Sequence, residues 1–86
     1  MKFLIVDDNG EMREMIKFYL RKFTPEFCEC TDGADALINF TVFQPDWVLM
    51  DWEMKNVDGI TATKQIIKDF PKANICMVTS LSLIHI

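Results

Sequence analysis

Three aspartates are placed in the sequence so that they could bind a cation and take part in catalysis. Asp7 and Asp8 directly follow the apolar run at residues 2–6, and Asp51 directly follows the run at residues 46–50. Apolar runs this short are typical of buried parallel strands. Carboxylates at neighbouring strand ends form an oxygen-rich pocket for a hard divalent cation such as Mg²⁺. Asp51 would then be a carboxylate nucleophile for a phosphoryl group.

The elements that must position these aspartates alternate between strand and helix. Strands are expected over residues 2–6, 27–30, 46–50 and 74–78, with Asp8 or Asn9 capping the first helix and the last helix running over about residues 59–70. Apolar or small residues recur between the strands at helical spacing, which predicts buried helix positions. These positions are Met12, Met15, Ile16, Tyr19, Leu20, Phe23, Ala36, Leu37, Phe40, Ile60, Thr63, Ile67 and Phe70.

Alternating strands and helices predict an α/β fold, in which a parallel sheet carries helices on both faces. Ligands bind such sheets at the carboxyl ends of the strands. Asp7, Asp8, Asp51 and Thr79 all fall at that edge. The pattern therefore predicts a single site there.

Composition narrows the class of protein. The chain has 86 residues, enough for one small domain, and a net charge of −4, which argues against a nucleic-acid-binding surface. No apolar stretch approaches the roughly 20 residues needed to cross a bilayer, and acids follow the N-terminal run too soon for a signal peptide. Cys28, Cys30 and Cys76 form no Cys-x-x-Cys pair, so we expect reduced structural thiols in a cytoplasmic protein.

Four motifs occur in an order and spacing that resemble the receiver domain of two-component response regulators. They are Val6-Asp7-Asp8-Asn9 with Arg13, Thr31 to Leu37 (TDGADAL), Asp51-Trp52-Glu53-Met54 with Asp58-Gly59, and Val78-Thr79-Ser80. The resemblance implies a flavodoxin-like, three-layer α/β fold with strand order 2-1-3-4. It also implies phosphorylation by a histidine kinase or phosphotransfer protein.

The same resemblance implies a role for each site residue. Asp51 would accept the phosphoryl group, and Asp8 and Asp51 would ligate Mg²⁺ directly, with Asp7 acting through water. The main-chain carbonyl of Glu53 would be a further ligand, and Thr79 would supply the switch hydroxyl. Lys55 departs from the family pattern, because the family usually has Pro at this position. With Lys in place of Pro, we expect the loop after Asp51 to be less rigid.

The end of the sequence also departs from the family. Members continue with a helix, a fifth strand that ends in an essential Lys, and a final helix, none of which follows residue 80. Residues 81–86 fit the reading frame CTG-TCT-CTT-ATA-CAC-ATC, which resembles a transposase mosaic end used in sequencing libraries. We therefore expect a partial receiver domain over residues 1–80 and a non-native tail over 81–86. The fourth strand would then be an exposed edge, open to self-association.

Three functions remain in competition. The first is a phosphoacceptor signalling module, which is not an enzyme because it transfers the group only onto itself. The second is an inert truncated fragment that cannot be efficiently phosphorylated or switched. The third is a phosphatase with an aspartate nucleophile. It is the weakest, because such enzymes usually carry a second Asp two residues later, where this chain has Glu53.

Overall fold

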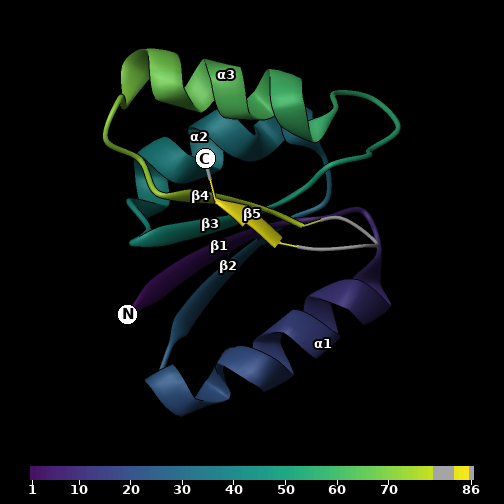
Figure 1. Ribbon diagram of the computed structural model, residues 1–86, viewed down its shortest axis with the longest axis vertical. Helices are drawn as coiled ribbons and strands as arrows, with labels where there is room; N and C mark the ends of the chain where they lie inside the picture. Colours follow the sequence, from purple (N-terminus) through teal and green to yellow (C-terminus); the bar gives the residue numbers. More distant parts are fainter. Residues whose placement is uncertain (79–82, 86) are drawn as a thin grey trace.

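A five-stranded sheet forms the centre of the molecule in this computed structural model, which describes residues 1–78 and 83–85. The strands lie in the order β2-β1-β3-β4-β5 (Figure 1). Four are parallel, and β5 is antiparallel to β4. Their bounds are β1 Lys2–Val6, β2 Glu26–Cys30, β3 Trp47–Asp51, β4 Ile75–Val78 and β5 Leu83–His85. The predicted order of the first four strands is confirmed.

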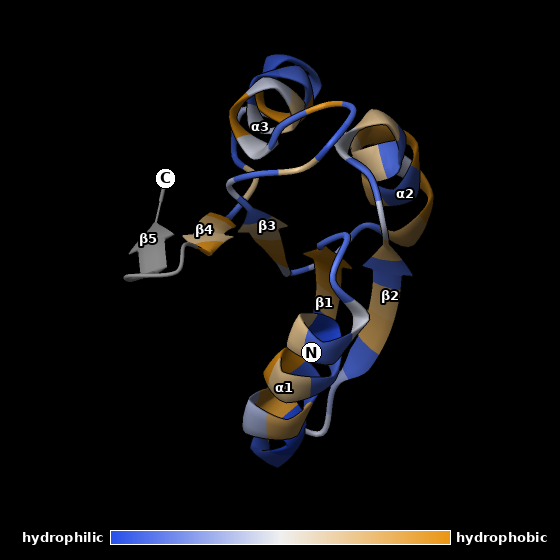
Figure 2. Ribbon diagram, turned by 90° about the vertical axis from the view of Figure 1, so that its right-hand side faces the viewer, coloured by the Kyte–Doolittle hydropathy of each residue, from blue (hydrophilic) through white to orange (hydrophobic). Residues whose placement is uncertain are grey.

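Three helices flank this sheet, which makes the predicted three layers. The helices are α1 Gly10–Leu20, α2 Ala36–Phe43 and α3 Gly59–Asp69, and 3₁₀ turns occupy η1 Arg21–Phe23 and η2 Gly33–Asp35. Helices α2 and α3 cover one face, and α1 lies on the other (Figure 2). No helix in the described residues is long and apolar enough to span a bilayer.

The main core lies between the sheet and helices α2 and α3. Alternate strand residues point to this face, as the two-residue period of a strand requires. The strands contribute Leu4, Val6, Cys30, Val48, Met50, Ile75 and Met77, and the helices contribute Ala36, Phe40, Ala62 and Ile66. Because β1 and β3 are neighbours in the sheet, the residues that follow them lie at the same edge.

Burial of α1 differs from the prediction. No residue of α1 is fully buried, and Met15 and Tyr19 are 46% and 67% exposed. The half-buried apolar residues of α1 are only Met12, Ile16 and Leu20. Among the described residues α1 is the only helix on its face, so the sheet shields a narrow stripe rather than the whole apolar surface. Phe23 and Ile60, at 44% and 40% exposed, were also wrongly expected to be buried.

The edge of the sheet differs as well. We expected β4 to be open, but residues Cys76, Met77 and Val78 pair with β5 in antiparallel register. The prediction of an exposed fourth strand is therefore wrong, and self-association stays untested. The predicted boundary between residues 80 and 81 also stays a prediction.

Candidate functional site

Asp7, Asp8 and Asp51 come together at the carboxyl edge of the sheet. Each offers a carboxylate oxygen, and these oxygens lie within 4.8 Å of one another. Strands β1 and β3 are hydrogen-bonded neighbours in which Val6 pairs with Met50, so the residues that follow each strand lie side by side. The sheet register therefore builds this acidic cluster.

Asp7 is the buried member of the acidic cluster, at 4% exposed. Its main-chain N–H donates to the Cys30 carbonyl at 2.9 Å, which extends the β1–β2 ladder. Its Oδ1 accepts the Asn9 N–H at 2.8 Å. Burial raises the pKa of the Asp7 carboxyl above its ordinary value, and the Asp8 carboxylate adds to this shift.

Asp8 is exposed and directly precedes the residue that caps α1. That cap is Asn9, whose Oδ1 accepts the N–H groups of Glu11 and Met12 at 2.9 and 3.2 Å. Because Asn9 satisfies the first turn of the helix, the Asp8 carboxylate is not needed as a cap. It lies instead in the acidic cluster.

Asp51 is half-buried at the end of β3. Burial first, and then the Asp7 charge, raise the pKa of Asp51 to about 6, although the Glu53 N–H bonded to its Oδ1 at 3.3 Å acts in the opposite direction. Three carboxylates this close repel one another, and a bound cation relieves that repulsion. An all-oxygen donor set suits a hard divalent cation and not a soft one. The residues present therefore fit Mg²⁺.

Two glycines allow the loop after Asp51 to pack closely. A Cβ on Gly59 would lie 2.0 Å from the Asp51 carbonyl oxygen, and a Cβ on Gly33 would lie 2.3 Å from the Val57 oxygen. The Gly59 N–H also donates to the Trp52 carbonyl at 3.2 Å. The sequence marked both glycines as parts of motifs but gave no sign of these contacts.

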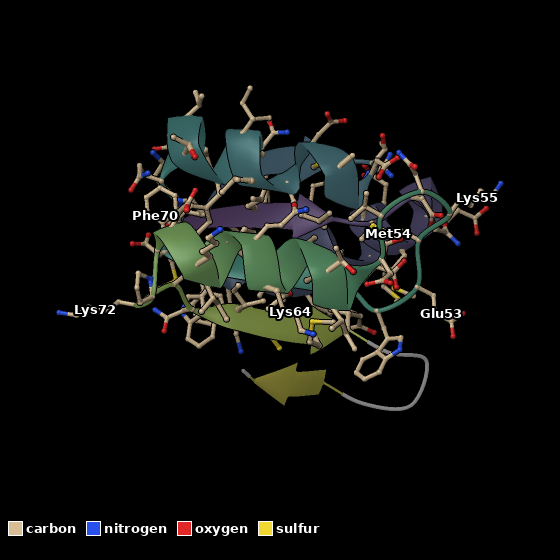
Figure 3. The ribbon with its side chains drawn as sticks, turned by 90° about the horizontal axis from the view of Figure 1, so that it is seen from above. Glu53, Met54, Lys55, Lys64, Phe70 and Lys72 are labelled. Carbon is tan, nitrogen blue, oxygen red and sulfur yellow. The ribbon has the colours of Figure 1, made fainter. Side chains whose placement is uncertain are left out.

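The remaining predicted site residues lie around the acidic cluster or outside the described chain. Figure 3 shows Glu53 and Lys55 on the loop after β3, pointing away from the body. An outward Glu53 side chain agrees with a role for its carbonyl alone, which stays a prediction. Thr79 lies outside the described residues.

Comparison with known proteins defines the class. The model of the response regulator receiver domain matches residues 3–84, so the chain belongs to this family of two-component signalling domains. It is 37% identical over 84 residues to the uncharacterized transcriptional regulatory protein YhcZ of Bacillus subtilis. That match covers 95% of this chain and 39% of YhcZ, so the chain spans about two-fifths of this relative's length.

Solved receiver domains have the same fold. The response regulator domain of CheB from Thermotoga maritima is 34% identical with a TM-score of 0.84, over 94% of this chain and 61% of that one. TrrA from the same organism, solved in complex with Mg²⁺ and BeF, is 29% identical with a TM-score of 0.82, over 93% and 71%. TrrA has also been solved in complex with the histidine kinase ThkA, in a match that is 31% identical with a TM-score of 0.83 over 94% of this chain and 70% of that one.

Proposed function

We propose that this domain accepts a phosphoryl group onto Asp51, with Mg²⁺, from a histidine kinase or phosphotransfer protein, and acts as a conformational switch in a phosphorelay. The main observation behind this proposal is that Asp7, Asp8 and Asp51 lie close together at the carboxyl edge of the sheet. The complexes of TrrA with Mg²⁺–BeF and with a histidine kinase support it by relationship.

Asp7, Asp8, Asp51 and the Glu53 carbonyl would hold Mg²⁺, which supplies neutralisation of the charge on the phosphoryl oxygens. The Asp51 carboxylate oxygen forms the new bond to phosphorus, and the bond from phosphorus to the donor breaks, with its electron pair leaving on the donor. Asp51 must be ionised to do this, and a pKa of about 6 leaves it mostly ionised at pH 7. Phosphoryl transfer depends mainly on such positioning and charge neutralisation.

The partner that we propose is a protein. The net charge of −4 argues against nucleic acid as the partner. We place the domain in the cytoplasm, because Cys28, Cys30 and Cys76 are free thiols. A phosphatase role is not favoured, because the residue two positions after Asp51 is an exposed Glu53 on the outer side of the loop.

Incubation with ³²P-labelled acetyl phosphate and Mg²⁺ tests the proposal. We expect up to one label per chain, absent in Asp51→Asn and retained in Asp35→Asn, which changes an exposed aspartate away from the acidic cluster. Absence of label in the folded wild type would favour the inert fragment. Continuous release of phosphate over many turnovers would favour an enzyme.

A further inference from the structure

Arg13 joins the acidic cluster to a group of ion pairs between α1 and β2. Its Nη1 donates to the main-chain carbonyl of Asp7 at 2.7 Å, and its Nε donates to Oε1 of Glu29 at 3.0 Å. The Arg13 side chain is only 19% exposed. One guanidinium therefore bonds the residue that follows β1 and a side chain of β2 at the same time.

Glu29 is held on both of its oxygens. Its Oε2 accepts Lys17 Nζ at 3.1 Å, and Lys17 also pairs with Glu14 at 2.5 Å. Lys17 first, and Arg13 after it, lower the pKa of Glu29, so this carboxylate is ionised at neutral pH. A fixed Glu29 fixes the plane of the Arg13 guanidinium, which a single ammonium group could not reproduce.

We propose that Arg13, oriented by Glu29, is a positioning residue for the acidic cluster, because its bond to the Asp7 carbonyl fixes the Asp7–Asp8 peptide and so directs Asp8 toward Asp51. Two other groups of Asp7 are already hydrogen-bonded: its N–H donates to the Cys30 carbonyl, and its Oδ1 accepts the Asn9 N–H. Arg13 holds the third group of this residue, the carbonyl that sets the plane of the next peptide. The inference rests on the proposed Mg²⁺ site and assigns a residue that does not itself ligate the ion.

Whether Mg²⁺ binding weakens or tightens when Arg13 is removed distinguishes a positioning role from simple charge repulsion. A guanidinium near a cation site repels the cation, so a bystander Arg would weaken binding, and its removal would tighten Mg²⁺ binding. A positioning Arg has the opposite effect, because its removal lets the ligands move apart. Groups that orient metal ligands are typically worth about 10- to 100-fold in affinity.

Mg²⁺ titration, followed by tryptophan fluorescence, to which Trp52 beside Asp51 contributes, and by the rise in Tm, tests this inference. We expect Arg13→Met to weaken Mg²⁺ binding about tenfold, Arg13→Lys not to restore it, and Glu29→Gln to weaken it less. Because Glu29 acts through Arg13, the double variant should bind no more weakly than Arg13→Met alone. Arg21→Met is the matched control, since Arg21 bonds the Phe18 carbonyl, away from the acidic cluster, and should leave the affinity unchanged. Unchanged or tighter binding by Arg13→Met would overturn the proposal.

A measurement without metal keeps this inference separate from the proposed function. Amide hydrogen exchange of Asn9, whose N–H bonds Asp7 Oδ1, should be faster in metal-free Arg13→Met than in the wild type and unchanged in Arg21→Met. Equal exchange rates would show that Arg13 does not hold this segment, whether or not Mg²⁺ binds. A wild type that fails to bind Mg²⁺ while the exchange difference is present would overturn the proposed function and leave the structural role of Arg13 standing.

Discussion

Asp51 lies where burial and the neighbouring Asp7 charge raise the pKa of its carboxyl to about 6. In the folded state the group therefore keeps its proton at pH values where the unfolded chain, with an ordinary pKa of 3.8, has lost it. Stability that comes from the protonated form is then lost as the pH rises from about 4 through about 6. The residue proposed to carry the chemistry thus destabilises the metal-free fold at neutral pH.

Asp51→Asn should stabilise the metal-free protein at pH 7, because a neutral amide carries no buried charge. Partial exposure of the side chain limits the gain to about 1–2 kcal/mol. Thermal melting in the presence of a chelator measures it, and the gain should shrink at pH 5, where the wild-type carboxyl is protonated. Asp35→Asn serves as the control. A loss of stability in Asp51→Asn at pH 7 would contradict the assigned charge repulsion.

Mg²⁺ should bind through Asp8, and its binding should change the tryptophan fluorescence, because Trp52 is next to Asp51 and 39% exposed. We expect Asp8→Ala to abolish the response, because it removes one of three carboxylates. Glu53→Gln should keep most of it, because we expect Glu53 to bind through its carbonyl. The wild-type response should weaken as the pH falls through about 6, where Asp51 takes up a proton that competes with the cation. A full response in Asp8→Ala would remove Asp8 from the site.

At the scale of the elements, close contact between α3 and the end of β3 sets the position of Asp51. Gly59 permits that contact, since any Cβ there would overlap the Asp51 carbonyl. Asp58 starts the helix beside it by accepting the Thr61 N–H at 2.7 Å. The helix start and the strand end are therefore packed as one unit.

Gly59→Ala should destabilise the protein by about 1–3 kcal/mol, because the Cβ would meet main-chain atoms that must shift. It should also weaken Mg²⁺ binding, because Asp51 would move. Gly10→Ala is the matched control for the unfolding measurement alone, because its Cβ would lie 3.4 Å from Arg13 Nη2, an ordinary contact. Urea unfolding of both variants measures the difference. Equal stabilities would mean that the loop relaxes freely.

The elements were largely predictable from sequence, because apolar runs and helical spacing are local signals. The expected strand at residues 46–50 is found at Trp47–Asp51, and the expected helix at about 59–70 is found at Gly59–Asp69. Local signals also predicted that the aspartates lie at the carboxyl edge of the sheet. They could not show that Arg13 reaches the Asp7 carbonyl or that Gly59 contacts Asp51, because those contacts depend on how the loops after the strands fold back in three dimensions.

At the scale of the whole molecule, the two faces of the sheet are covered unequally. Helices α2 and α3 cover one face with a continuous buried core. On the α1 side Phe3 and Ile5 of β1 are buried, but Trp47, Leu49 and Cys76 of β3 and β4 are only half-buried. This unequal cover explains why α1 keeps exposed apolar residues that its periodicity placed in the core. How many helices share a face cannot be deduced from the pattern of one helix.

The β4 edge depends on β5 for its cover, which leads to a prediction about association. Removing residues 83–86 would take away the antiparallel strand that pairs with Cys76, Met77 and Val78 and would leave the β4 edge open. Open strand edges pair with other chains. We therefore expect the shortened chain to associate more strongly with rising concentration, and to melt at a lower temperature, than the 86-residue chain. Sedimentation velocity and thermal melting measure both effects, under reducing conditions because Cys28, Cys30 and Cys76 are free thiols. If both chains sediment as monomers and have the same melting temperature, β5 does not protect this edge. The association predicted from sequence would then have to use another surface.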